Sequence, residues 1–281
     1  MKLSNTTRLR LASALLASLF PFFAFGADVS VPLLGNPQHR LERPDTSNLR
    51  VLRIITDDSY PPFGFARADG SLTGFNVDLA RALCEELKIP CTIQARRWDT
   101  LLDALQQGQA DVAIASIAMT PANLRRADFT APYYKTPARF AVRQSSTLTE
   151  TLPESMSGQT IGVEGHTAHE AYLRTFFPNA ILRTYESSAA LRSALRRGEV
   201  DVIFSDGVGL SLWLAGAEAA QCCRFAGEPF FDTQFFGEGA GIAVKRDNVI
   251  VRRAMDYALK RLDENGVYAD LYLKYFPLGF Y

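Results

Sequence analysis

The segment LLDALQQGQADV, residues 101–112, recurs with an offset of 90 residues as LRSALRRGEVDV, residues 191–202. Leucine, alanine, leucine, glycine, aspartate and valine stand at matching places in the two segments. Each copy has the pattern of a helix that ends at a glycine and is followed by a short, buried strand. Such units are common enough to match by chance, but two copies in one chain predict two lobes of similar build.

The chain around the first copy alternates between strand-like and helix-like patterns. A β-rich run starts at Leu49 and ends in the turn-prone residues 57–62, and leucines recur every fourth residue after Gly74, as on a helix. We expect a strand at 91–95, a helix at 98–107 and a strand at 110–115. This alternation is typical of an α/β fold with mostly parallel sheets.

Composition narrows the class of protein. The 281 residues are 47% hydrophobic and 21% charged, as in an ordinary globular protein that can bury a core. Thirty basic residues balance thirty acidic ones, so the chain has no basic field for nucleic acid.

The first 26 residues have the pattern of a secretory signal peptide. Three positive charges precede an uncharged apolar run at 11–25, and small residues at Ala24 and Gly26 predict cleavage after Gly26. An uncleaved membrane anchor fits less well, because the run is shorter than the roughly 20 residues of a span and contains Pro21. Cleavage would leave 27 basic and 30 acidic residues, with no cysteine near the new terminus to carry a lipid. Residues 27–49 contain three prolines, one glycine and two asparagines, and predict an irregular arm.

Export implies an oxidising compartment, in which disulfides persist. Cys84 and Cys91 are seven residues apart, and we expect them to form a disulfide. Cys222 and Cys223 are adjacent, which rarely permits a bridge, so we expect one buried thiol and one idle neighbour. We expect no metal site and no cofactor, because no cluster of candidate ligands has the required spacing. His166 and His169, near Glu170, are expected to be solvated.

The repeat also predicts where a ligand would bind. Open parallel sheets bind ligands at the carboxyl ends of their strands. Ser116 stands at this end in the first copy and Asp206 in the second, again 90 residues apart. A cleft between the lobes would therefore offer a hydroxyl or backbone donor on one side and a carboxylate on the other. This chemistry suits a small polar solute.

Six segments, in order, resemble the periplasmic solute-binding proteins of polar amino acid ABC transporters, the family-three type. The resemblance covers about 49–275. The segments are GFNVDLA at 74–80, the Cys84/Cys91 pair, Thr120-Pro121 followed by Asp128-Phe129-Thr130, IGV at 161–163 leading to Gly165, GEVD at 198–201, and GEGAGIA at 237–243.

The resemblance implies a two-lobed α/β fold in which each lobe is a mostly parallel sheet flanked by helices. Lobe 1 would be discontinuous, from 50–140 and 240–281, and lobe 2 would be 141–239. Two crossing strands, near 139–142 and 241–243, would form the hinge about which the lobes close. It further implies a periplasmic monomer that hands its solute to an ABC permease and is not an enzyme.

Ligand-binding roles carry over to seven positions. Asp57 and Tyr60 match contacts to the ligand's side chain, Trp98 a stacking ring, Ser116 a donor near the carboxylate, Thr167 a helix start that favours an anion, and Asp206 the acid that grips the α-ammonium group. Plainer interpretations stay open: Asp57 and Tyr60 could only shape the turn, Trp98 could only begin a helix, and Asp206 could only be an N-cap.

The seventh position, Asn123, departs from the family pattern. Amino-acid binders carry arginine there, where its planar head grips the ligand's carboxylate. Arg125 and Arg126 follow, but on a continuing helix they would point about 200° and 300° away. Arg96 or Arg97 could supply a substitute cation. We therefore expect an amine, or an amino-acid derivative whose carboxylate is masked, missing or held differently.

Two other functions are compatible with this fold. Some similar proteins are exported cyclohexadienyl dehydratases, for which Glu164, His166 and His169 could transfer protons. The loss of the arginine at 123 argues against their dicarboxylate substrates. The second alternative is an accessory or sensory binding protein that transports nothing.

Overall fold

The computed structural model describes residues 42–281. The predicted signal peptide and most of the predicted arm lie outside the described residues. Within 42–281, no helix is both long and apolar enough to cross a membrane.

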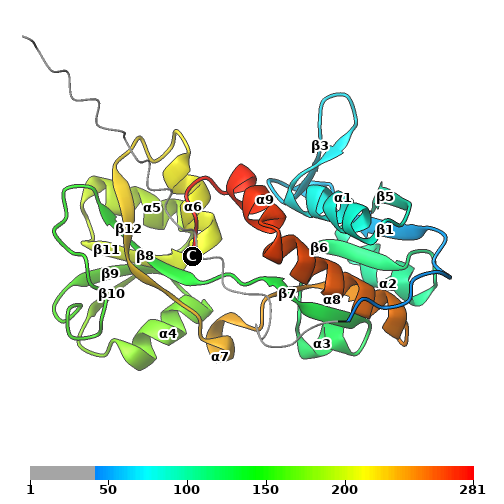
Figure 1. Ribbon diagram of the computed structural model, residues 1–281. Coiled ribbons are helices and arrows are strands. Elements are labelled where there is room, and N and C mark those ends of the chain that lie inside the picture. Colours follow the sequence, from blue (N-terminus) through cyan, green and yellow to red (C-terminus); the bar gives the residue numbers. More distant parts are fainter. Residues whose placement is uncertain (1–41) are drawn as a thin grey trace, which may run out of the picture.

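Two five-stranded sheets form the two halves of the molecule (Figure 1). The strand order is β5-β1-β6-β13-β7 in the first sheet and β10-β9-β11-β8-β12 in the second. In each sheet three neighbouring strands pair parallel, and the fourth strand, β13 or β8, pairs antiparallel with both of its neighbours. The first sheet contains β1 (Leu52–Thr56), β5 (Cys91–Ala95), β6 (Val112–Ala118), β7 (Asp128–Tyr134) and β13 (Ala240–Val244). The second contains β8 (Ala138–Arg143), β9 (Thr160–Glu164), β10 (Ile181–Tyr185), β11 (Val202–Asp206) and β12 (Cys223–Phe230).

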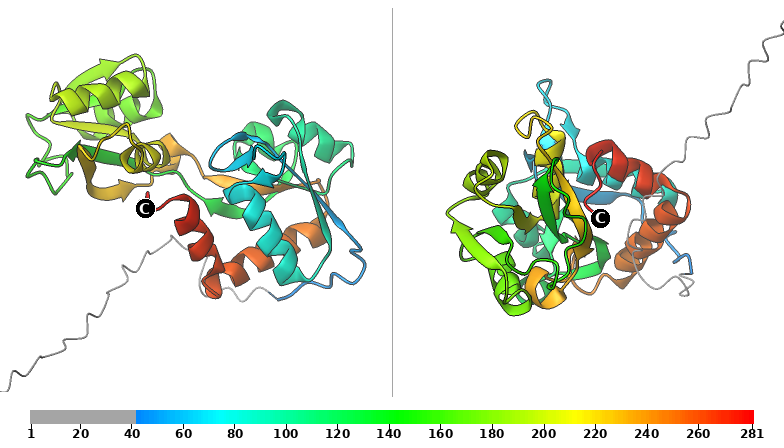
Figure 2. Two further views of the ribbon diagram at one scale, coloured as in Figure 1. Left: turned by 90° about the horizontal axis from the view of Figure 1, so that it is seen from above. Right: turned by 90° about the vertical axis from the view of Figure 1, so that its left-hand side faces the viewer.

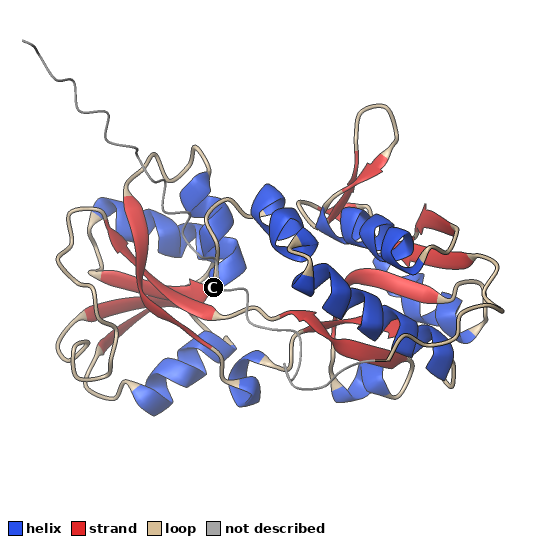
Figure 3. Ribbon diagram, viewed as in Figure 1, coloured by secondary structure: helices blue, strands red, loops and turns tan. Residues whose placement is uncertain are grey.

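Helices flank both sheets (Figure 3). The first half has α1 (Phe75–Leu87), the 3₁₀ turn η1 (Trp98–Thr100), α2 (Leu101–Gln106), α3 (Pro121–Leu124), α8 (Val249–Glu264) and α9 (Val267–Tyr275). The second has α4 (Ala168–Phe176), α5 (Ser188–Arg197), α6 (Gly207–Ala215) and α7 (Thr233–Phe236). A small antiparallel sheet of β2 (Ser59–Tyr60), β3 (Gly64–Ala66) and β4 (Leu72–Thr73) projects from the first half. The predicted α/β, two-lobed fold is confirmed.

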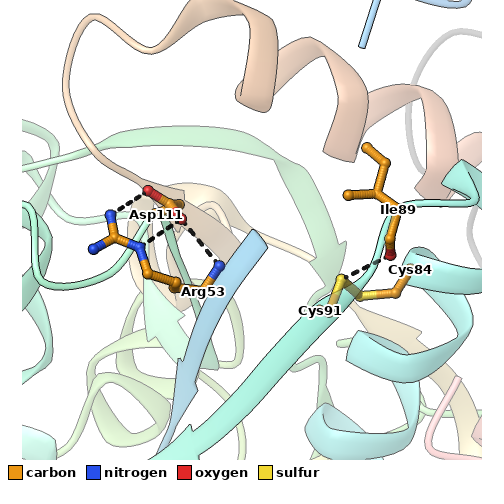
Figure 4. Close-up of a disulfide and its surroundings, with 5 residues drawn as sticks. All are labelled: Arg53, Cys84, Ile89, Cys91 and Asp111. Carbon is orange, nitrogen blue, oxygen red and sulfur yellow. Dashed lines mark hydrogen bonds and ion pairs between the residues drawn. A yellow bond between two sulfur atoms is a disulfide. The ribbon is translucent and has the colours of Figure 1, made fainter. Parts of the chain in front are cut away.

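The repeat corresponds to α2–β6 in one half and α5–β11 in the other. Gly198 ends α5 in the left-handed conformation, with φ of 77°, as expected of a glycine that closes a helix. The repeated aspartates have one role in common. Asp111 accepts the backbone N–H of Arg53 at 3.0 Å and pairs with its guanidinium (Figure 4), and Asp201 accepts the backbone N–H of Thr160 at 2.9 Å. Each aspartate thus ties the start of its strand to the neighbouring strand.

The chain crosses between the sheets at two places, which differ from those predicted. Strand β7 ends at Tyr134 and β8 begins at Ala138, so the first crossing is 135–137; the return crossing is 231–239. The predicted crossings at 139–142 and 241–243 instead lie inside β8 and β13, where Phe140 and Ile242 are fully buried. Apolar, β-forming segments are held in the sheet ladders, whereas Pro137 lies in the connection.

The end of the chain contacts both halves beside these crossings (Figure 2). Phe280 is buried against Tyr272 and Phe276 of the first half. From the second half, the Arg139 guanidinium donates to the Phe280 carbonyl at 3.4 Å, and the Ser211 hydroxyl donates to the Leu278 carbonyl. The closing segment 276–281 therefore links the two sheets.

All four cysteines are bonded in pairs. The predicted Cys84–Cys91 disulfide is confirmed and joins the end of α1 to the start of β5 (Figure 4). The expectation for Cys222 and Cys223 was wrong, because these neighbours form a disulfide with each other. Ala220 and Gln221 adopt positive φ in the turn before them, and this turn brings the chain into β12.

Candidate functional site

Ser116 lies at the carboxyl end of β6 within a closed hydrogen-bond network. Its backbone N–H donates to the Tyr133 hydroxyl at 2.9 Å, that hydroxyl donates to the Asn76 side-chain oxygen at 2.7 Å, and the Asn76 amide donates to Ser116 Oγ at 3.1 Å. Ser116 has φ of 58°, a conformation that non-glycine residues seldom adopt. Backbone conformations that are rarely adopted, and that surrounding hydrogen bonds hold in place, occur often at functional sites. The Ser116 hydroxyl proton has no partner within this network.

A groove at the junction of the halves contains Ser116. Its other lining residues come from the end of β6, the crossing after β7 and the return crossing: Ala118, Met119, Thr120, Tyr134, Thr136, Phe236, Gly237, Glu238, Gly239 and Ala240. Phe236 is the last residue of α7 and also stacks on His169 of α4, with 5.2 Å between ring centroids. The groove thus joins the carboxyl end of the first sheet to aromatic residues of the second half.

Three stacked rings form one wall of the first half, which we call the aromatic wall: Tyr60, Phe63 and Tyr134. The Tyr60 and Phe63 centroids are 5.0 Å apart with ring planes 10° apart, and those of Phe63 and Tyr134 are 5.2 Å apart. Tyr60 is 50% exposed although the other two rings are buried. An exposed ring on a rigid support is a ready surface for a ligand.

Asp57 directly follows β1 and stands three residues before Tyr60 in the chain. It is 6% exposed, and both carboxylate oxygens accept from the Ser59 hydroxyl at 3.0 Å. Within residues 42–281 no lysine or arginine forms an ion pair with it.

Asp206 ends β11 and begins α6. Its side chain accepts the Gly209 N–H at 2.7 Å, so the N-cap interpretation is confirmed. Burial raises the pKa of its carboxyl to about 6, although the Gly209 amide and the Arg192 guanidinium both favour the charged form. Its charge also acts on the opposite half: the pKa values of Tyr60 and Tyr134 are raised mainly by burial and further by Asp206. The capping carboxylate is therefore close enough to the aromatic wall for its charge to act on Tyr60 and Tyr134.

Trp98 and Asn123 line a second pocket, which lies in the first half with Asp99, Leu101, Leu102, Ile117 and Arg126. Trp98 is 50% exposed. The Asn123 side-chain amide donates to the Ala118 carbonyl at 2.9 Å, and its backbone N–H is capped by Thr120 at 3.2 Å. Asn123, the neutral residue at the position where the family pattern has an arginine, is thus hydrogen-bonded within its own loop.

The expectation that Arg126 faces elsewhere was wrong. Helix α3 ends at Leu124, so Arg126 does not continue it, and its side chain lines the same pocket as Asn123. Its guanidinium pairs with Asp103 at 2.5 Å. Arg97 is also paired, with Asp99, on the exposed surface.

Thr167 caps α4, where its hydroxyl accepts the Glu170 N–H at 3.3 Å and donates to the Glu164 carbonyl at 2.7 Å. The prediction that His169 is solvated was wrong. His169 is half-buried and packs against Phe236 and Phe204, and burial lowers its pKa to about 4. Among residues 42–281 no group of three His, Cys, Asp or Glu could hold a metal ion.

The structure thus brings Tyr60 and Asp206 into electrostatic reach, places Ser116 in the junction groove, and groups Trp98 with Asn123. Their roles toward a ligand stay predictions. Phe63, Tyr134 and Phe236 were not identified from the sequence, because only the fold brings them into the aromatic wall or the junction groove. The Tyr133–Tyr134 pair at the end of an apolar strand was the one available signal.

Comparison with known proteins gives a consistent result. Residues 52–278 match the family model described as bacterial extracellular solute-binding proteins, family 3. The L-arginine-binding protein of Pseudomonas aeruginosa is 32% identical over 234 residues, 83% of this chain and 90% of that protein. A putative ABC transporter arginine-binding protein of Escherichia coli is 30% identical, covering 80% of this chain and 90% of the relative.

Solved structures also resemble this one. An ancestral cationic amino acid solute-binding protein has a TM-score of 0.60 at 27% identity, covering 81% of this chain and 96% of that one. The second substrate-binding domain of Lactococcus lactis GlnP shares the fold, with a TM-score of 0.69 at 22% identity and coverage of 85% and 100%. The chain belongs to family 3 of the bacterial extracellular solute-binding proteins.

Proposed function

We propose that this protein captures an amino acid, amine or amino-acid derivative between its two halves and delivers it to an ABC permease. Its relatives include periplasmic proteins that bind arginine, histidine, or lysine, arginine and ornithine. Together with the pattern of residues 1–26, this supports a periplasmic location for the mature protein after removal of a signal peptide. We further infer that the mature protein acts as a monomer with one closing cleft.

The observation that carries the proposal is a half-buried carboxylate at Asp206 combined with a neutral residue at the position expected to hold an arginine. Asp206 is a carboxylate whose pKa is raised by burial, so a cationic ligand would relieve the cost of its charge. At the position where the family resemblance leads us to expect an arginine, Asn123 donates its amide to Ala118 instead. The site therefore favours a ligand bound by its amine, with its carboxylate masked, missing or held differently.

The remaining contacts would position such a ligand. Tyr60 and Trp98 offer exposed rings for an alkyl chain or a cation. Ser116 offers a hydroxyl, and the start of α4 at Thr167 offers backbone amides to a polar group.

We infer binding rather than catalysis. His169 stays neutral against Phe236, with a pKa lowered to about 4, and Glu164 accepts the Ser188 hydroxyl. A dicarboxylate substrate would need cations at the reacting centre, whereas Arg126 and Arg97 are already paired with Asp103 and Asp99. Incubation with prephenate or arogenate should yield no product.

A thermal-shift screen tests the proposal. Residues 27–281 are unfolded and refolded to remove any ligand that copurifies, and are then mixed with α-amino acids, the amines formed by their decarboxylation, opine-like derivatives or carboxylates. A ligand at 100 times its Kd should stabilise the fold by about 2.7 kcal/mol. We expect shifts with amines or derivatives that are absent in Asp206→Asn. Stabilisation by plain amino acids alone would contradict the proposal. If no compound of the panel shifts the melting temperature, the result would favour an accessory or sensory role.

A further inference from the structure

The closing segment 276–281 is anchored in the first half. Phe276 and Phe280 are each 1% exposed and belong to the hydrophobic core of that half. The Tyr272 hydroxyl of α9 accepts the Phe280 backbone N–H at 2.7 Å, and the Tyr272 ring stacks on Tyr281 with 5.4 Å between centroids. This side of the segment therefore moves with the first sheet.

The other side of the closing segment bonds to the second half. The Ser211 hydroxyl of α6 donates to the Leu278 carbonyl, and the Arg139 guanidinium of β8 donates to the Phe280 carbonyl at 3.4 Å. Ser211 is 1% exposed, and Val208, one turn earlier on α6, is buried in the core of the first half. These contacts join the two halves at a place outside the covalent crossings.

The closing segment also contacts both crossings. Lys135 of the first crossing donates its backbone N–H to the Tyr281 hydroxyl at 3.2 Å. Phe231 of the return crossing stacks on the Tyr281 ring, with 6.0 Å between centroids and 28° between ring planes. One side chain is therefore in contact with both of the connections about which the halves can rotate.

Arg139 gives a physical reason why this arrangement of the halves is favoured. It is 7% exposed, and no aspartate or glutamate within 42–281 forms an ion pair with it. Its partners are the Gly227 carbonyl at 3.1 Å, the Phe280 carbonyl, and the Phe225 ring, whose centroid is 4.4 Å from the guanidinium carbon. A buried cation is costly when it loses an acceptor. Movement of the closing segment away from β8 would therefore raise the free energy.

The closing segment lies outside the candidate binding surfaces. None of its residues lines either of the two pockets described above, whereas Thr136 and Phe236 of the crossings line the junction groove. In this arrangement Tyr60 and Trp98 are each 50% exposed. Rotation about the crossings that narrowed the groove would displace α6 and β8 against a segment that is fixed to the first half.

We propose that the closing segment is a strap that holds the halves apart and sets how often the junction groove narrows without a ligand. Its contacts with α6, β8 and the crossings favour the present arrangement, and they are lost or displaced when the second half rotates. A ligand that bridges the halves must offset these contacts, so the strap lowers the apparent affinity for such a ligand. This inference goes beyond the proposed function, and its test needs no ligand.

Removing two hydroxyl groups that bond the closing segment to α6 and to the first crossing tests this inference. Ser211→Ala/Tyr281→Phe eliminates one hydrogen bond at each place and retains every ring contact. Tyr275→Phe is the matched control, because its hydroxyl donates to Asp78 of the same half. Circular dichroism establishes that each variant is folded.

Spin labels report the distance between the halves in refolded residues 27–281. They are attached at Gln106→Cys of α2 and Ala189→Cys of α5, which are exposed positions in opposite halves, and read by double electron–electron resonance. We expect the same dominant distance in the wild-type background and in Tyr275→Phe. The double variant should raise the population at a second distance by about tenfold or more, as two lost hydrogen bonds imply. Small-angle X-ray scattering of the unlabelled proteins should give the double variant the smaller radius of gyration.

The outcomes are independent of ligand binding. A double variant whose distance distribution matches wild type, or whose radius of gyration is larger, would overturn the inference. An equal second population in Tyr275→Phe would also overturn it, because loss of a hydroxyl within one half would then suffice. No result of the thermal-shift screen changes these measurements, so failure of the strap and failure of the proposed function are distinguishable.

Discussion

Asp206 is the residue whose chemistry depends most directly on pH. Its pKa is raised to about 6 by burial, so its carboxylate becomes protonated as the pH falls through 6. We expect the affinity for a cationic ligand to fall by about tenfold for each pH unit below 6. Titration calorimetry at pH 7.5, 6 and 5 measures this. Unchanged affinity at pH 5 would show that another group holds the cation.

The stability of the ligand-free protein should respond in the opposite direction. A carboxyl whose pKa is higher in the folded chain than its usual 3.8 favours the fold when protonated, so its contribution to unfolding free energy rises as the pH falls from 7 toward 4. His169, whose pKa is lowered to about 4, acts against this trend. The difference between wild type and Asp206→Asn isolates the effect, because asparagine retains the N-cap. A difference that is constant from pH 7 to pH 5 would contradict the shift.

Residues at the carboxyl ends of strands could be placed from the sequence. Ser116 and Asp206 follow from the 90-residue repeat. Sequence reasoning missed Arg126 because it assumed that α3 continued, whereas the helix ends at Leu124. It missed Tyr134 and Phe236 because their approach to the junction groove depends on long-range packing that no local pattern encodes.

At the scale of the elements, the Cys84–Cys91 disulfide holds α1 against β5. Constraining a loop of this length in the unfolded chain should contribute about 2.5 kcal/mol on the chain-entropy account. We expect Cys84→Ala/Cys91→Ala to lower the unfolding free energy by that amount in urea. Cys222→Ala/Cys223→Ala is a matched control, because a loop of two residues should contribute only about 1 kcal/mol. Equal losses from the two double variants would contradict this explanation.

Most elements could be predicted because local pattern and packing agree. Strand β5 has the predicted bounds, and the helix expected at 98–107 forms as η1 and α2. The crossings were misplaced because residues 139–142 look the same whether they pair with β11 and β12 or pass between lobes. The pairing of β8 with β11 and with β12 places these residues inside the second sheet. The Cys222–Cys223 bond follows a turn in which Ala220 and Gln221 have positive φ, a conformation that these residue types do not signal.

For the whole molecule, the closing segment 276–281 links both halves beside the two crossings. Phe280 is 1% exposed, and its truncation to alanine should lower the unfolding free energy by about 3 kcal/mol or more. Leu278→Ala should cost less than about 0.5 kcal/mol, since that side chain is 43% exposed. Chemical denaturation compares the two variants. A loss for Phe280→Ala no larger than that for Leu278→Ala would show that this segment does not stabilise the fold.

The most direct test of the proposed function restores the missing cation. Wild type and Asn123→Arg are each titrated calorimetrically with agmatine and arginine, which differ by one carboxylate. We predict that wild type binds agmatine at least about tenfold more tightly than arginine, and that Asn123→Arg reverses the order, because a guanidinium bonded to a carboxylate contributes about 1.5–3 kcal/mol. Tighter binding of arginine by wild type, with no change in order in Asn123→Arg, would contradict the account.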